Sequence, residues 1–358
     1  MPKTIAITPS WYWPQGVPRV IGVPPYSLGE LCIDRPARVQ PEELALIAGD
    51  IRLTTSQLKE AVDLAAASHS PGTTVEIGGR ATVDSVITLF AALKGGTFVR
   101  LADTPGSGGG PAFDGAADMR QPAISLAGVT GEVSHSHRSI LASALSLVTF
   151  IEAAPQRPWL VSLPMARWEG LLSLISPLLT LSPAVLAPEG GDPEETVRTM
   201  VAEQTAFAFD DLESVYQWTR DAKRATRDAR RLLEGFMLSA PAMFDPDSRR
   251  RVGRSFECPA LTVYGTGETG PIFASHSSWY LDESIGLPLT NMHVVPADPR
   301  TGAPIQALWE LVESAEVTAF SPALFCADES HTARFVDGRY RTGVMASSDA
   351  NGMIYLIG

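Results

Sequence analysis

A glycine-rich turn with a single carboxylate is the part of this 358-residue sequence best suited to chemistry. It reads Tyr-Gly-Thr-Gly-Glu-Thr-Gly from Tyr264 to Gly270, and the apolar residues 261–263 lead into it as a short strand. Open α/β sheets place ligands beyond the carboxyl ends of their strands. Glu268 is therefore a candidate catalytic or ligand-binding residue, although a lone carboxylate after a strand caps a turn about as often.

The three glycines also have the Gly-x-Gly-x-x-Gly spacing of dinucleotide-binding folds, at Gly265, Gly267 and Gly270. Such a fingerprint opens a helix and keeps its acid about 20 residues downstream. Here the acid lies inside the loop, and Pro271 follows it with no helical start. The pattern argues against a dinucleotide site, and a plain turn is the simpler alternative.

The same stretch resembles the Tyr-Gly-x-Thr-Glu signature of the adenylate-forming enzymes, with Gly267 in place of the threonine. This superfamily comprises acyl- and aryl-CoA ligases, luciferases and peptide-synthetase adenylation domains. Further segments resemble its motifs in the same order along the chain: 45–54, 163–165 with Gly170, 239–242, 286–288, 310–311 and 335–343. Because so many ordered matches are rare by chance, the chain is identified as a divergent member of this superfamily.

The resemblance implies an α/β fold with two stacked βαβ sheet subdomains and a small terminal β-rich subdomain. We expect these subdomains at residues 1–110, 111–290 and 291–358. The family's C-terminal lid domain is expected to be absent, because the sequence stops where the hinge to that domain would begin.

The resemblance also assigns roles to individual residues. It implies ATP or AMP and magnesium as ligands, with Glu268 as a tentative magnesium ligand. The residues it places at the nucleotide are Gly128, Thr130, Gly131, Ser239, Ala240, Pro241, Tyr264, Gly265, Thr266 and Gly267. Met165, Arg167 and Trp168 fall where family members line the acyl pocket. Arg167 could pair there with an anionic group, but a surface arginine beside a core tryptophan is the simpler interpretation.

The segment that matches the family's phosphate loop is degraded. Residues 127–138 keep Gly128, Thr130 and Gly131, but about three residues are missing, and the family's lysine is Ser134. Glu132 would bring a negative charge towards a triphosphate. At 4 Å that repulsion amounts to about 4 kcal/mol per unit charge at an effective dielectric near 20. This loop is poorly built for ATP.

Two further departures from the family also argue against ATP-dependent adenylation. The family's Thr-Gly-Asp motif holds the ribose with its aspartate, whereas Thr342-Gly343 is followed here by Val344. The four lysines are Lys3, Lys59, Lys94 and Lys223, and none lies in a recognised motif. Truncation of a longer enzyme would not explain these changes, so divergence is the favoured interpretation.

Alternating strand and helix patterns must position these residues. A hairpin at 45–53 leads through the capping box Thr54-x-x-Gln57 into a helix at 58–68, followed by a strand at 75–77, a helix at 83–93 and a strand at 98–101. Strands at 123–126, 159–162, 184–187 and 261–264 and helices at 139–151, 170–179, 194–203 and 212–234 continue the rhythm. This order predicts a largely parallel sheet. Residues 104–110 are glycine-rich and indicate a linker rather than a phosphate cradle.

Composition limits the remaining possibilities. The chain is 45% hydrophobic and 19% charged, which is typical of a globular protein with a large core. A net charge of −12 argues against a nucleic-acid partner, and no apolar run is long enough for a membrane span. Cys32, Cys258 and Cys326 are scattered, so we expect buried free thiols in a reducing cytoplasm, not a disulfide or a zinc site. His135 and His137 have no third ligand near them in sequence and make a poor metal pair.

The sequence therefore predicts an acyl- or aryl-CoA ligase-like protein that handles a carboxylic acid, its adenylate or its thioester, in a specialised biosynthetic pathway. ATP-dependent adenylation is expected to be weakened or lost. One alternative is a non-catalytic protein that binds a ligand or docks on a partner. Another is an incomplete enzyme that needs a separate C-terminal domain, a carrier protein or a pathway enzyme as its partner.

Overall fold

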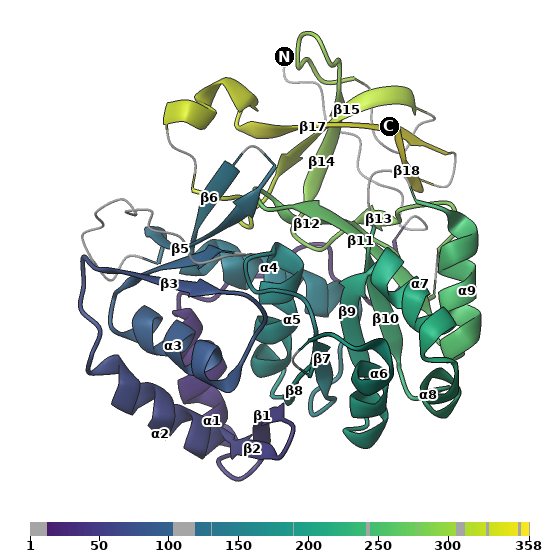
Figure 1. Ribbon diagram of the computed structural model, residues 1–358. Coiled ribbons are helices and arrows are strands. Elements are labelled where there is room, and N and C mark those ends of the chain that lie inside the picture. Colours follow the sequence, from purple (N-terminus) through teal and green to yellow (C-terminus); the bar gives the residue numbers. More distant parts are fainter. Residues whose placement is uncertain are drawn as a thin grey trace.

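Three β-sheets and the helices packed against them make up the structure (Figure 1). The computed structural model describes residues 13–102, 119–129, 131–188, 190–240, 244–278, 280–305, 312–326, 329–349 and 352–357. The α/β fold expected from the sequence is confirmed, with two mixed sheets flanked by helices and a third, β-rich layer.

The largest sheet has nine strands in the order β13-β12-β11-β10-β9-β7-β8-β1-β2. The six central strands are parallel: β11 (Ala260–Thr266), β10 (Gly235–Ser239), β9 (Phe207–Asp211), β7 (Trp159–Val161), β8 (Ala184–Leu186) and β1 (Leu44–Ala48). The antiparallel edges are β2 (Ile51–Thr54), β12 (Gly270–Ala274) and β13 (Leu287–Pro288). The carboxyl ends of the parallel strands share one edge, where α/β sheets bind ligands.

The second sheet is four-stranded, in the order β3 (Thr74–Gly78), β4 (Phe98–Ala102), β5 (Pro122–Gly128) and β6 (Gly131–Ser136). Only β6 in this sheet is antiparallel. The third sheet contains β14 (His293–Ala297), β15 (Val312–Phe320), β16 (Phe335–Val336), β17 (Arg339–Ser348) and β18 (Ile354–Ile357). Residue 110 is the expected boundary between the first two subdomains. Two strand pairings join segments on either side of it: β1 pairs with β8, and β4 pairs with β5.

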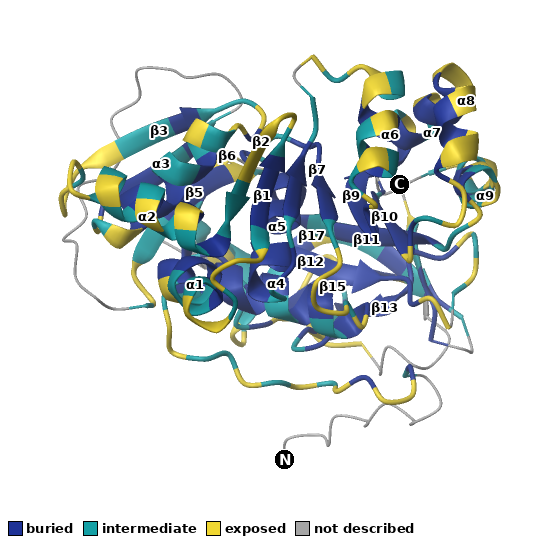
Figure 2. Cartoon of the chain, turned by 90° about the horizontal axis from the view of Figure 1, so that it is seen from below, coloured by how far each residue is buried: buried dark blue, intermediate teal, exposed yellow. Residues whose placement is uncertain are grey.

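Helices α4 (His137–Phe150) and α5 (Trp168–Leu179) form the centre of the molecule. They pack against each other, α5 also contacts β7, β8 and β9, and α4 contacts β5, β6 and β12. Every residue of α5 is buried, as Figure 2 shows by its dark colour. A helix that is buried all round needs apolar residues on every face, which the sequence from Leu171 to Leu179 supplies.

Of the remaining helices, all but the last cover the outer faces of the two mixed sheets, and the last packs against β16 and β17 of the third sheet (Figure 1). In chain order they are η2 (Glu30–Asp34), α1 (Arg35–Val39), α2 (Thr55–Ala66), α3 (Val83–Lys94), α6 (Pro193–Ala202), α7 (Leu212–Asp221), α8 (Lys223–Asp228), α9 (Pro246–Phe256) and η3 (Glu329–Arg334). None of the helices in the described part of the chain is both long and apolar enough to cross a membrane.

Most local signals in the sequence are confirmed. The Thr54–Gln57 capping box starts α2, and the first strands form the expected hairpin. The single helix expected at 212–234 is wrong, because the chain leaves helical geometry at Ala222 and separates α7 from the short α8. The three cysteines are free thiols, but of the three only Cys32 is buried as expected, whereas Cys258 and Cys326 are half-buried. Residues 104–110, read as a linker, lie outside the described residues.

Candidate functional site

The glycine-rich segment forms the turn of a β-hairpin. Strand β11 ends at Thr266, β12 begins at Gly270, and these two residues are paired. The Thr269 hydroxyl accepts a hydrogen bond of 3.2 Å from the Thr266 N–H and helps to close the turn. Glu268 lies within this turn, yet its exposed fraction is 0%. The turn is therefore packed into the interior of the protein.

The degraded phosphate-loop segment forms a second hairpin. Strand β5 ends at Gly128 and β6 begins at Gly131, and these residues are also paired, so only two residues connect the strands. Thr130 lies outside the described residues. The Glu132 carboxylate is bound by Arg100, with 2.8 Å between Nε and Oε2. Its charge is offset by this arginine and is not directed at a phosphate site.

The two turns are in direct contact. The Val129 N–H donates a hydrogen bond of 2.9 Å to Oε1 of Glu268. A Cβ on Gly267 would lie 2.1 Å from the carbonyl oxygen of Ala127, so only glycine allows this approach. A Cβ on Gly128 would lie 2.9 Å from Oε1 of Glu268. The buried carboxylate therefore sits against the short hairpin, where the family resemblance places the phosphates.

His135 fastens the contact from the side of β6. Its Nε2 lies 2.6 Å from the carbonyl oxygen of Gly267, and its Nδ1 lies 3.1 Å from Oγ of Ser139. Because a carbonyl only accepts, Nε2 carries the proton and Nδ1 accepts from the serine hydroxyl. Burial lowers the pKa of His135 to about 4, so the ring is neutral at pH 7.

The two histidines of this segment have separate partners. His137 Nδ1 accepts the Leu28 N–H at 3.3 Å, and burial lowers its pKa to about 4. Within the described residues, no three histidine, cysteine or acidic side chains are grouped as metal ligands. The sequence did not identify His135 as a positioning residue, because its partner Gly267 is 132 residues away.

The third sheet covers the same turn. The Phe325 N–H donates a hydrogen bond of 2.9 Å to the carbonyl oxygen of Glu268, and its ring packs on Tyr340 at 5.3 Å. Burial, then the charge of Glu268, raises the pKa of Tyr264 to about 12. The pKa of Tyr340 is raised by the same two causes in the same order. The sequence segments 128–135, 264–270 and 335–343 are thus brought together around one carboxylate.

Val344 occupies the position of the family's ribose-binding aspartate. Its N–H donates to Oγ1 of Thr342 at 3.1 Å, and its side chain packs against the hydrophobic core. The neighbouring Gly343 N–H donates to Oε1 of Glu316, a buried residue that also forms an ion pair with Arg341. The polar groups around Val344 are thus engaged within the third sheet.

A second group of predicted residues meets at the carboxyl ends of β9 and β10. The Ser239 hydroxyl donates a hydrogen bond of 2.6 Å to Oε1 of Glu169. The Arg167 guanidinium donates to the same oxygen at 3.1 Å and lies 3.6 Å from a carboxylate oxygen of Asp211. Ala240 is buried beside Ser239. Glu169 links these segments, and no sequence motif indicated this role.

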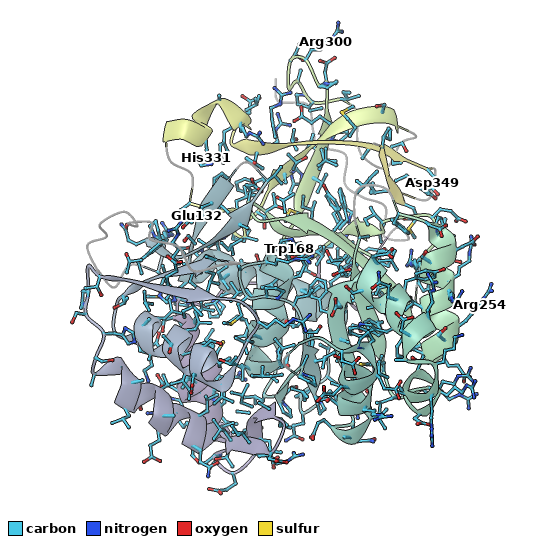
Figure 3. All side chains as sticks on the ribbon, viewed as in Figure 1. Glu132, Trp168, Arg254, Arg300, His331 and Asp349 are labelled. Atoms are coloured by element: carbon cyan, nitrogen blue, oxygen red, sulfur yellow. The ribbon has the colours of Figure 1, made fainter. Side chains whose placement is uncertain are left out.

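Pro241 lies outside the described residues. The remaining substrate-pocket residues are part of the core. Met165 and Trp168 are buried, and Figure 3 marks Trp168 in the interior of the molecule. Its indole packs edge-on against Phe209, with 5.6 Å between the ring centroids. Beside Trp168, His135 and Gly267 lies a void of about 10 Å³. A cavity of this size holds at most about one water molecule. In this conformation the space between α5 and the glycine-rich turn is filled.

Comparison with known proteins supports the family resemblance seen in the sequence. A sequence profile described as AMP-binding enzyme matches residues 130–310. No curated protein matched the chain.

Solved structures share the fold at low sequence identity. o-Succinylbenzoate CoA synthetase (MenE) from Bacillus subtilis, in complex with ATP and magnesium ion, has 18% identity and a TM-score of 0.77, covering 91% of this chain and 78% of that one. Apo MatB from Rhodopseudomonas palustris has 15% identity and a TM-score of 0.80, covering 93% and 78%. The N-terminal domain of FACL13 from Mycobacterium tuberculosis has 15% identity and a TM-score of 0.80, covering 93% and 100%.

Proposed function

The chain belongs to the family of AMP-binding enzymes, and from this premise we propose that it handles a carboxylic acid, or the adenylate or thioester of one, with its ATP-dependent adenylation weakened or lost. The contact between the Val129 N–H and the Glu268 carboxylate carries this proposal. A backbone N–H that would face a phosphate is bound instead by the protein's own buried anion.

The residues present do not fit Mg-ATP. A triphosphate is normally held by several N–H groups of a glycine-rich loop, by a lysine and by magnesium. The connection between Gly128 and Gly131 is too short to wrap phosphates. A phosphate oxygen about 4 Å from the Glu268 carboxylate would meet a repulsion of about 4 kcal/mol per unit charge at an effective dielectric near 20. Magnesium could offset this charge only by reaching a carboxylate whose exposed fraction is 0%.

The cationic side chains point to the same conclusion. Lys94 forms ion pairs with Asp34 and Asp63, and Lys59 is bound to Asp63. These two lysines lie on α2 and α3, on the outer face of the second sheet. They are therefore held by a surface network and are not directed at the Glu268 turn.

A pyrophosphate-exchange assay tests the proposal. The purified chain is incubated with Mg-ATP, labelled pyrophosphate and a panel of aliphatic and aromatic carboxylic acids. We expect label incorporation into ATP no faster than for heat-denatured protein, because the hairpin cannot hold the leaving pyrophosphate. Exchange that depends on one acid of the panel would contradict the loss of adenylation and would identify the substrate.

The filled interior supports a second candidate function. The void beside Trp168 has room for about one water molecule, so an acyl group would have to displace side chains to enter. This favours a non-catalytic protein that acts through a ligand elsewhere, or by docking on a carrier protein, a separate C-terminal domain or another enzyme of a biosynthetic pathway in the cytoplasm. In that case Glu268→Gln leaves pathway output unchanged in cells.

A further inference from the structure

A polar cavity of about 260 Å³ lies at the carboxyl ends of β7 and β9, apart from the Glu268 turn. Segment 163–164, which precedes α5, and the first turns of α6 and α7 form its walls. The hydrogen bonds from Ser239 and Arg167 to Glu169 mark its boundary towards β10. Its volume is just below the range of about 300–1,000 Å³ for small-molecule sites, so a compact ligand fits.

A guanidinium group and a buried carboxyl group face this cavity without meeting. The Asp210 carboxylate is buried, with an exposed fraction of 3%, and accepts hydrogen bonds from the Ser162 hydroxyl and, at 2.7 Å, from the Asp211 N–H. Arg80 acts on Asp210 electrostatically but forms no ion pair with it. Among the described residues, the Arg80 side chain has no hydrogen-bond or ion-pair partner.

The other charges of the lining are already paired. Arg167 is bound by Glu169 and lies near Asp211, and Asp211 also caps α7 by accepting the Ser214 N–H at 2.8 Å. The guanidinium of Arg80 lies against Gly191 at the rim, where a Cβ would lie 2.6 Å from Nη2. The cavity thus offers one available cation at its rim and one buried carboxyl group in its wall, whose ionised form a bound cation would stabilise.

This arrangement discriminates between ligand classes. A simple anion would gain Arg80 but would face Asp210 and Asp211, and a metal ion would gain the aspartates but would face Arg80 and Arg167. A buried carboxylate is costly unless it is paired, and an ammonium group would supply that pairing. We propose that this cavity binds a small zwitterion, an amino acid whose carboxylate pairs with Arg80 and whose ammonium group pairs with Asp210.

This inference does not depend on nucleotide use, since the cavity is separate from the Glu268 turn. The test is a calorimetric titration, without nucleotide, of the full chain with each of the twenty standard L-amino acids. We expect at least one to bind with a Kd of about 1 mM or tighter. Its deaminated acid and its carboxamide, which each lack one charge, should bind at least about tenfold more weakly.

Two variants and a matched control locate the binding. Arg80→Gln and Asp210→Asn should each weaken binding at least about tenfold, whereas Arg254→Gln, an exposed arginine on α9, should not (Figure 3). The proposal is overturned if none of the twenty amino acids binds, if both variants bind like the wild type, or if the deaminated acid binds equally well. Exchange of pyrophosphate into ATP would contradict the proposed function and leave this result untouched.

Discussion

Gly267→Ala is expected to lower the free energy of unfolding by about 3 kcal/mol or more, which is at the upper end of the cost of overpacking. The new Cβ would lie 2.1 Å from the carbonyl oxygen of Ala127 and 2.7 Å from Cα of Gly128. Both are backbone atoms, so relief requires the two hairpins to separate. Separation also breaks the bonds from Val129 to Glu268 and from His135 to Gly267. Urea unfolding measures the change.

Gly22→Ala is the matched control, because nothing lies within 4 Å of its added Cβ. We expect its free energy of unfolding to stay within about 0.5 kcal/mol of the wild type. Amide hydrogen exchange at Val129 gives a local readout, since loss of the Glu268 acceptor should speed exchange in Gly267→Ala. A Gly267→Ala protein as stable and as protected as the wild type would mean that the two turns are not packed together.

The second large effect concerns Asp210 and pH. Burial, partly offset by the Ser162 hydroxyl, raises the pKa of Asp210 to about 7 from its ordinary 3.8. Between these values the unfolded chain has released the proton and the folded chain holds it. The folded state therefore loses stability as pH rises through this window, at up to about 1.4 kcal/mol per pH unit.

Asp210→Asn removes this titration. The stability of the variant relative to the wild type should rise by as much as about 4 kcal/mol from pH 4 to pH 7.5, as measured by urea unfolding at several pH values. The pKa values of His135 and His137 are lowered, so these two residues reduce the stability of the folded state as the pH falls. Their contributions are common to both proteins and cancel in the difference.

Asp228→Asn, at an exposed position on α8, controls for the loss of one negative charge. Its free energy of unfolding should change with pH in the same way as that of the wild type. If the free energy of unfolding of Asp210→Asn also changed in this way, Asp210 would release its proton at the same pH in the folded and the unfolded chain, and its surroundings would be more polar than those in the structure. The expected gain at neutral pH also means that weaker ligand binding by this variant would not reflect unfolding.

The fold was largely predictable because its signals are local. The capping box at Thr54 and Gln57, the apolar periodicity and the glycine turns are read from neighbouring residues. The order of motifs then identified the family. The break at Ala222 was missed because neither glycine nor proline marks it. There the Thr226 hydroxyl lies 3.4 Å from the carbonyl oxygen of Trp218, a contact that only the folded chain reveals.

The candidate site was predictable only in part. Gly128, Gly267 and Glu268 were identified from family motifs, and the structure brings them together. The partners that define their chemistry are far apart in sequence, since Val129 and Glu268 are separated by 139 positions. Glu169 lies in the segment expected beside the acyl pocket, but the sequence did not indicate that it binds Ser239. Arg80 and Asp210 belong to no motif, because they matter through the side chains that face them. Sequence spacing does not encode such contacts.

The proposed loss of nucleotide binding rests on the carboxylate of Glu268, which accepts the Val129 N–H where the family resemblance places a nucleotide phosphate. The most direct test is a calorimetric titration of the purified chain with Mg-ATP and, separately, with AMP. The structure predicts no binding heat with either nucleotide up to about 1 mM, because Glu268 is buried against Val129 and the hairpin between Gly128 and Gly131 is closed. Binding of either nucleotide at micromolar concentration would contradict this, and would mean that the turns separate to admit it.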